Sequence, residues 1–126
     1  MADGWRRNHG SASPFEPVYG YSRAVRVGNR IDVAGCAPIE PDGSSTVGDA
    51  GVQAARCLTI IGEALEALGG SFADVVRTRM YITDAADADR VGQAHGAIFG
   101  AIRPAATMLV IPALIRPEWK VEIEAE

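Results

Sequence analysis

Two glutamates near the C-terminus and one arginine at the head of an apolar stretch are the residues best placed to do chemistry. Glu122 and Glu124 are two residues apart in WKVEIEA, so on a strand their carboxyl groups share a face and lie about 7 Å apart. Paired carboxyl groups can divide general-acid and general-base work, although a solvated, charged strand is the commoner explanation. Arg103 opens RPAATMLVIPAL, where it is either a surface residue at a turn or a cation at the mouth of a pocket.

Most of the other reactive side chains are expected to be structural. Cys36 and Cys57 form no CxxC and have no nearby histidine, so we expect small buried thiols rather than a catalytic thiol or a metal site. His95 lies beside the apolar stripe of a predicted helix, which is more typical of a partly buried ring than of a catalyst. A two-histidine metal site would require His9 to fold back from the N-terminal segment. Tyr21 precedes a strand, where it either packs or presents its hydroxyl to a pocket.

Composition indicates one ordinary soluble domain. The chain has 126 residues, of which 48% are hydrophobic and 22% charged, with a net charge of −4. The basic residues are scattered, which disfavours nucleic acid as a partner. No apolar stretch approaches the length that spans a membrane, and the polar N-terminus lacks a secretory apolar core. We therefore expect a cytoplasmic protein with no membrane association.

The elements that must position these residues follow from the apolar periodicity. Residues 1–18, rich in Gly, Ser, Asn, Arg and Pro, predict an extended N-terminal arm, and residues 19–126 a single domain. The predicted order in that domain is β-β-α-β-α-β-β. Its parts are a hairpin around Gly28-Asn29, a helix from Asp49 to about Leu68, the strand VVRTRMYIT, a helix from about Asp87 to Phe99, and the strands ATMLVIP and WKVEIEA.

The strand ATMLVIP predicts association between copies of the chain. It is apolar at odd and even positions, which is typical of a strand that is buried on both faces. Two helices can cover only one face of a four- or five-stranded sheet, and the chain is too short for a third layer. We therefore expect another copy to cover the second face, with clefts between subunits.

Three stretches in this order together resemble the RidA/YjgF family, whose members are also described as L-PSP endoribonuclease-like or reactive intermediate deaminases. They are VGNRIDVAGCAPI, DVVRTRMYITD, and RPAATMLVIPAL followed by VEIEA. The resemblance runs from Tyr21 to Glu126. It implies an α+β, chorismate-mutase-like mixed sheet with two helices on one face, assembled as a homotrimer with three intersubunit clefts. Members with deaminase activity hydrolyse enamines or imines, released by pyridoxal-phosphate enzymes, to ketoacids and ammonia without a metal or organic cofactor.

The resemblance also implies roles for particular residues. Glu122 falls at the family's cleft glutamate, which would be catalytic. Tyr21 falls at the cleft tyrosine and Gly35 at the glycine whose backbone faces the substrate. Ala106 stands where the family has the arginine that binds the substrate carboxylate, and Thr107 follows it. Ala106 and Thr107 are therefore candidate substrate-binding residues together with Tyr21 and Gly35.

Departures from the family pattern predict a pocket that is not built for the usual imino acids. Ala106 lacks the guanidinium group that grips a carboxylate with two hydrogen bonds. Ala34 and Gly92 stand where the deaminases usually carry a serine and an asparagine, and the loop before Pro104 is shorter. Arg103, three residues before Ala106, is a candidate substitute for the missing anchor.

Three functions remain open at this point. The first is hydrolysis of a small imine, enamine or related metabolite that lacks the carboxylate handle, with Glu122 positioning or activating water. The second is a non-catalytic module that binds or senses a small molecule in the same cleft. The third, endoribonuclease activity, is disfavoured by the acidic balance and by the lack of a basic groove with aromatic residues. The expected partners are a small-molecule ligand and further copies of the chain.

Overall fold

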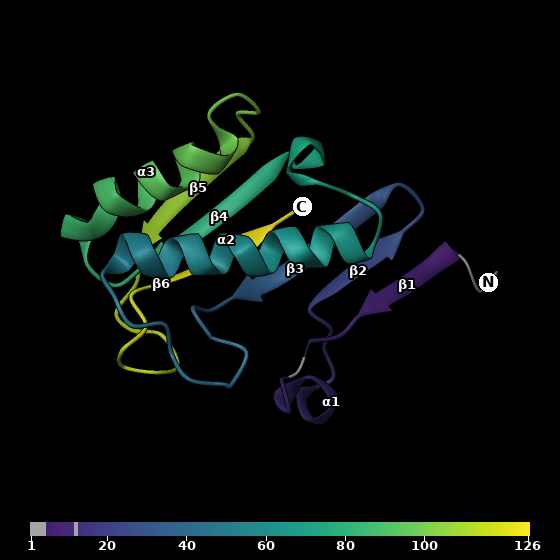
Figure 1. The fold of residues 1–126 in the computed structure, drawn as a ribbon, viewed down its shortest axis with the longest axis horizontal. Coiled ribbons are helices and arrows are strands. Elements are labelled where there is room, and N and C mark those ends of the chain that lie inside the picture. The colour runs from purple at the N-terminus through teal and green to yellow at the C-terminus, as the bar shows by residue number, and fades with distance from the viewer. Residues whose placement is uncertain (1–4, 12) are drawn as a thin grey trace.

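The computed structural model describes residues 5–11 and 13–126, and its centre is one mixed sheet. The strand order is β1-β2-β3-β6-β4-β5, with β4 and β5 parallel and the other neighbours antiparallel. The strands are β1 (Arg6–His9), β2 (Ala24–Val27), β3 (Arg30–Cys36), β4 (Arg77–Ile82), β5 (Ala105–Val110) and β6 (Val121–Ala125). Helices α2 (Ala50–Ala67) and α3 (Ala88–Phe99) lie over the same face of the sheet, and the short α1 (Phe15–Tyr19) lies to one side of them (Figure 1). The predicted chorismate-mutase-like α+β fold with two long helices on one face is confirmed.

Helix α2 begins and ends where local chemistry dictates. The Asp49 carboxylate accepts a hydrogen bond from the Val52 amide at 3.0 Å, which satisfies one of the donors left free at a helix start. Gly69 follows the helix with a φ of 85°, a left-handed conformation that favours glycine. Val52 is 50% exposed because it lies outside the buried stripe of the helix, which already includes Ala50 and Gln53 in the same turn.

The core lies between α2, α3 and the covered face of the sheet. In β6 and β4 every second residue is buried, as the alternating sequence predicts. Two short 3-10 helices, Phe72–Asp74 and Ala85–Asp87, precede β4 and α3. The Phe72 ring packs over Gly62 so closely that a β-carbon on residue 62 would lie 2.6 Å from it. The buried aliphatic and aromatic residues include Leu58, Ile61, Leu65, Met80, Ile82, Val91, Phe99, Val121 and Ile123.

Part of the N-terminal segment 1–18 forms strand β1 of the sheet. Strand β1 pairs with β2 from Arg6 opposite Val27 to His9 opposite Ala24. The sheet therefore has six strands instead of the four or five expected, because β1 satisfies the backbone groups on the free side of β2. Residues 1–4 and 12 of the predicted arm lie outside the described residues.

The β2–β3 hairpin turns at Gly28-Asn29 as predicted. Val25 pairs with Asp32 and therefore lies on the face opposite to Ile31. A two-residue turn pairs Val27 with Arg30, so odd positions of β2 share a face with even positions of β3. Val25 consequently lies on the face away from α2 and α3, which we call the open face of the sheet.

Strand β5 forms one edge of the sheet and leaves apolar side chains uncovered. Its residues alternate between the two faces, yet Leu109 is 51% exposed and Val110 57% exposed. Within this single chain the strand is thus not buried on both faces. Strand β5 has the apolar pattern of a strand that is buried on both faces. The described residues of the same chain, however, leave its apolar side chains uncovered.

Candidate functional site

Glu122 and Glu124 lie side by side on the open face of the sheet. Val121, Ile123 and Ala125 of β6 point into the core, so the two glutamates point the other way. Burial raises the pKa of the Glu122 carboxyl, Glu124 raises it further, and Arg23 opposes them. Glu124 accepts a hydrogen bond from the Tyr81 hydroxyl and lies 3.8 Å from Arg79. The two carboxyl groups therefore have different surroundings, and the raised pKa of Glu122 favours a group that can take up and release a proton.

Gly35 lies against Glu122 because of an irregularity in β3. Val33 pairs with Ala125 and Cys36 with Ile123, so three steps along β3 match two steps along β6. This bulge brings Ala34 and Gly35 together opposite Glu124. A β-carbon on residue 35 would lie 2.5 Å from Glu122 Oε2, so only glycine lets the carboxyl group reach the backbone here. The structure thus brings two of the predicted site residues into contact.

Arg23 is a third member of this group that the sequence reasoning did not identify. Its Nη1 donates to the Gly35 carbonyl at 2.6 Å and lies 3.6 Å from Cys36 Sγ. Its guanidinium carbon is 5.7 Å from the centre of the Tyr21 ring. The sequence did contain a signal for this role. Arg23 is at an odd-numbered position like Val25, which lies on the open face, whereas Arg26 is at an even-numbered position. We refer to Glu122, Gly35, Arg23 and Tyr21 as the Glu122 site.

Tyr21 connects the Glu122 site to a cavity on the open face. It is 39% exposed, and it lines a cavity of about 390 Å³ together with Ala34 and Glu124. Strand β1 contributes Arg6 and Asn8 to the same wall. The N-terminal strand therefore helps to shape the space beside the predicted site residues.

The other predicted site residues lie apart from the Glu122 site. Ala106 pairs with Thr78, a core residue, and thus belongs to the helix side of β5. Thr107 is on the open face and accepts a hydrogen bond from Arg77 Nη2 at 3.2 Å. Thr107 and Glu124 both pair with Arg79 of β4, so they are two strand spacings apart, about 10 Å, and Glu122 lies two residues further along β6.

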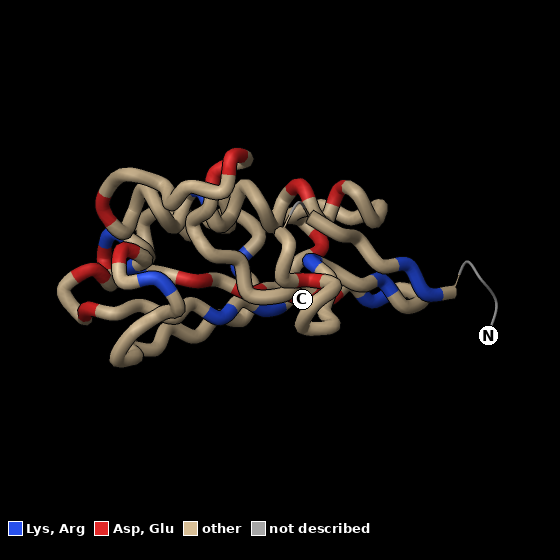
Figure 2. The backbone as a smooth tube through the Cα atoms, turned by 90° about the horizontal axis from the view of Figure 1, so that it is seen from below, with Lys and Arg blue, Asp and Glu red and all other residues tan. Residues whose placement is uncertain are grey.

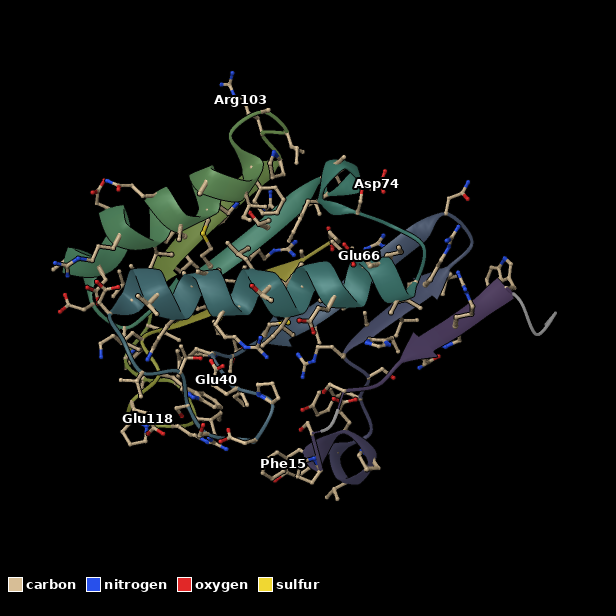
Figure 3. All side chains as sticks on the ribbon, in the orientation of Figure 1. Phe15, Glu40, Glu66, Asp74, Arg103 and Glu118 are labelled. Atoms are coloured by element: carbon tan, nitrogen blue, oxygen red, sulfur yellow. The ribbon has the colours of Figure 1, made fainter. Side chains whose placement is uncertain are left out.

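Arg103 lies at the turn between α3 and β5 and points away from the sheet (Figure 3). It is exposed and has a left-handed φ of 57°. Its amide donates to the Phe99 carbonyl at 2.8 Å, which closes the end of α3. Within one chain Arg103 is therefore not directed at Ala106 or Glu122.

The two cysteines and His95 have structural surroundings. Burial raises the pKa of Cys36 to about 11, although neighbouring Arg23 lowers it, and burial also raises the pKa of Cys57. Both thiols are thus protonated at neutral pH. The His95 ring is hydrogen-bonded to the Thr78 hydroxyl at 2.9 Å, and burial lowers its pKa. Nowhere in residues 5–11 and 13–126 do three His, Cys, Asp or Glu side chains gather in a metal-binding arrangement.

Comparison with known proteins settles the family. The family model described as endoribonuclease L-PSP matches residues 11–126. The chain belongs to the RidA/YjgF family. A crystal structure of a YjgF/YER057c/UK114 family member from Mycobacterium tuberculosis superposes with a TM-score of 0.87 and 42% identity, covering 95% of this chain and 96% of that one.

Two curated relatives extend the family match. A RutC family protein of Pyrococcus abyssi is 34% identical over 111 residues, which are 87% of each chain. The mouse 2-iminobutanoate/2-iminopropanoate deaminase is 33% identical over 106 residues, 83% of this chain and 78% of the mouse protein. The family therefore includes named imine deaminases. None of the helices in the described residues is long and apolar enough to cross a membrane.

Proposed function

We propose that this chain is a RidA-type hydrolase of a small imine or enamine, with Glu122 as the catalytic carboxyl group. The observation that carries the proposal is the half-buried Glu122 carboxyl, which has a raised pKa and lies against the Gly35 backbone. Burial makes this carboxyl group a stronger proton acceptor than an exposed glutamate, which suits proton exchange with a bound substrate. Kinship with a mouse protein named as an imine deaminase supports the same reaction class.

The reaction needs only water and proton transfers. Water adds to the imine carbon while the nitrogen takes up a proton, which gives a carbinolamine. The carbinolamine then releases ammonia as its hydroxyl proton leaves and the carbonyl forms, so C=N and H₂O become C=O and NH₃. Glu122 would take the proton from water and deliver a proton to the nitrogen, and Tyr21 with the Gly35 backbone would hold the substrate. No redox change and no cofactor is required.

A homotrimer would complete the site. Ala106 and Thr107 lie at the edge strand β5, two strands from Glu122, so they can border the Glu122 site only of a neighbouring copy. The exposed Leu109 and Val110 on the same strand provide apolar surface for such a neighbour. We therefore place each cleft between the Glu122 site of one chain and β5 of the next.

A non-catalytic binding module is the second candidate, and the composition of the β5 half of the cleft favours it. Ala106 offers no polar side-chain group there, and Gly92 of α3 has open space where a side chain could stand. A cleft with few polar groups can hold a ligand without turning it over. Endoribonuclease activity has little support, because basic positions are interspersed with acidic ones along the chain (Figure 2). A cytoplasmic location also remains a proposal.

Ammonia release from freshly generated imines, with and without a carboxylate, tests the enzyme against the binding module. We expect the wild-type protein to accelerate release over a buffer blank and Glu122→Gln to lose about 10²- to 10⁴-fold of that acceleration. Glu118→Gln is the matched control, since Glu118 is exposed in the loop before β6 and bonds to Ser45. Absence of acceleration with every imine would refute the hydrolase and leave the binding module.

A further inference from the structure

Tyr81 lies directly opposite Glu122 on the neighbouring strand β4, and its hydroxyl donates to Glu124. We propose that Tyr81 and Glu124 form a positioning pair, in which the Tyr81 hydroxyl holds the Glu124 carboxylate toward Glu122 and the negative charge strengthens Glu122 as a proton acceptor. The effect on catalysis rests on the proposed function, whereas the effect on proton binding by Glu122 does not. We call these two residues the Tyr81–Glu124 pair.

The two oxygens of Glu124 are held by different residues of β4. Oε1 accepts the hydrogen bond from the Tyr81 hydroxyl, and Oε2 lies 3.8 Å from Arg79 Nη1. Arg79 is the residue that pairs with Glu124 across the strands, whereas Tyr81 pairs with Glu122. The bond from Tyr81 to Glu124 therefore runs diagonally between the strands, and it turns Oε1 toward Glu122.

The charge of Glu124 is only partly balanced by Arg79. Arg79 Nη1 lies 3.8 Å from Glu124 and 3.8 Å from Glu126, so one guanidinium is shared by two carboxyl groups beyond hydrogen-bond distance. The remaining charge acts on Glu122, which lies on the same face of β6. Burial is the largest cause of the raised pKa of Glu122, Arg23 lowers this pKa, and Glu124 raises it.

The other charged and titratable groups around the two glutamates do not duplicate the Tyr81–Glu124 pair. Arg23 acts on Glu122 in the opposite direction, and burial keeps the Cys36 thiol protonated and neutral by raising its pKa to about 11. Asp32 lines the cavity beside Glu124, where water screens its charge. The groups that face the two glutamates from the surrounding elements are Arg6 of β1, Tyr21 and Arg23 before β2, Asp32 and Cys36 of β3, Arg79 and Tyr81 of β4, and Glu126 at the end of β6.

A stronger proton acceptor suits the first step of the proposed reaction. Glu122 takes a proton from water as the water adds to the imine carbon, and a neighbouring negative charge favours that uptake. The Tyr81 hydroxyl keeps the charge in one place by fixing Oε1. Tyr81 and Glu124 thus act through Glu122, which makes them positioning residues rather than catalytic ones.

Titration of the Glu122 carboxyl group, followed by NMR of the side-chain carboxyl carbons in the full chain, tests the pair without requiring turnover. The signal of Glu122 is the one absent from Glu122→Gln. We expect Glu124→Gln, which removes the charge but keeps an acceptor for Tyr81, to move the Glu122 midpoint to lower pH. Tyr81→Phe frees the Glu124 carboxylate to turn away and should move the midpoint in the same direction by less. An unmoved midpoint in Glu124→Gln would overturn the proposal.

Two control variants match these changes away from the site. Tyr19→Phe removes the hydroxyl of a tyrosine of α1 that is 71% exposed. Glu66→Gln removes the charge of an exposed glutamate of α2, which lies on the helix layer (Figure 3). Both should leave the Glu122 midpoint unchanged, because neither residue adjoins Glu122.

The double variant Tyr81→Phe/Glu124→Gln separates positioning from a direct or structural role. Its Glu122 midpoint should equal that of Glu124→Gln, because Tyr81 acts only through the charge of Glu124. A further shift would show that Tyr81 acts on Glu122 directly, which overturns the pair. A fall in the thermal midpoint of Tyr81→Phe with no movement of the Glu122 titration would show a structural role and also overturn it.

The pH dependence of kcat/KM for ammonia release separates this inference from the proposed function. In Glu124→Gln and Tyr81→Phe the acid limb should move to lower pH and the plateau should fall a few-fold, because Glu122 becomes a weaker base. Shifted NMR titrations without ammonia release from any imine would refute the hydrolase alone. Hydrolysis with the same acid limb in wild type and both variants would refute the Tyr81–Glu124 pair alone.

Discussion

The Glu122 carboxyl rests on the backbone of Gly35, so closely that a β-carbon on residue 35 would stand 2.5 Å from Oε2. The contact depends on the bulge that brings Ala34 and Gly35 together on β3. The position of the candidate catalytic group is therefore set by a residue that has no side chain.

Gly35→Ala should displace the Glu122 carboxyl and lower the rate of ammonia release by about 100-fold, since an error of about 1 Å in a reacting group has effects of that size. Gly96→Ala is the matched control. A β-carbon on Gly96 of α3 meets nothing within 4 Å, so this change should leave the rate alone and stabilise the helix by about 0.5–1 kcal/mol. An unchanged rate in Gly35→Ala would show that the reaction does not depend on this contact.

Glu122→Gln should change the dependence of stability on pH. The pKa of Glu122 is raised above the model-compound value of 4.5, mainly by burial, so its stabilising contribution is complete below about pH 4.5 and is lost as the pH rises through the folded-state pKa. The glutamine variant carries no such loss. The free energy of unfolding of Glu122→Gln, measured with urea and taken relative to wild type at the same protein concentration, should therefore increase from pH 4 to pH 8.

Glu118→Gln provides the opposite sign in the same measurement. The Ser45 hydroxyl lowers the pKa of Glu118, so ionised Glu118 contributes stability above about pH 4.5 that is lost as the pH falls through the folded-state pKa. The free energy of unfolding of Glu118→Gln should therefore fall relative to that of wild type as the pH rises. Parallel pH profiles for both variants would contradict the assignment of Glu122.

Leu109→Lys should convert the proposed trimer into single chains. Leu109 is 51% exposed on the edge strand β5, and a lysine there would place a charge in the apolar contact. Light scattering should report a fall from three chain masses to one, together with loss of ammonia release. Val47→Lys introduces the same charge at a loop residue that is 94% exposed and should leave the mass unchanged. A monomeric wild-type protein would remove the intersubunit cleft altogether.

Thr78→Val should destabilise the fold by about 1 kcal/mol, because it removes the hydroxyl bonded to His95 Nε2 while keeping the shape of the side chain. Thr59→Val is the control, since the Thr59 hydroxyl bonds to the Ala55 carbonyl on the exposed side of α2. Its effect should stay within about 0.5 kcal/mol. Equal effects in urea unfolding would mean that the Thr78–His95 bond contributes little.

Periodicity predicted the parts of the fold that have one buried face. The stripe from Leu58 to Leu65 and the cap at Asp49 predicted α2 to within a residue of its ends, and the alternation in WKVEIEA predicted which side of β6 carries the glutamates. Strand β1 was missed because RRNH is polar on both faces and carries no period. Its pairing is made by backbone groups, which a side-chain pattern does not report.

The candidate site was predictable only where the family resemblance supplied it. Glu122 and Gly35 were named from the sequence, but their contact depends on a one-residue bulge that leaves no mark in the alternation of β3. Arg23 was overlooked because its role comes from long-range neighbours, Gly35 and Glu16, rather than from its own strand.

The two edges of the sheet have opposite character. Strand β1 at one edge begins with two consecutive arginines, whereas β5 ends the sheet with uncovered leucine and valine. Growth of a sheet into a continuous fibre requires every molecule to offer an adhesive strand at both ends. This chain offers one. The arginine-bearing strand β1 disfavours the addition of another strand at its edge, so edge-to-edge growth of the sheet into a fibre is not expected.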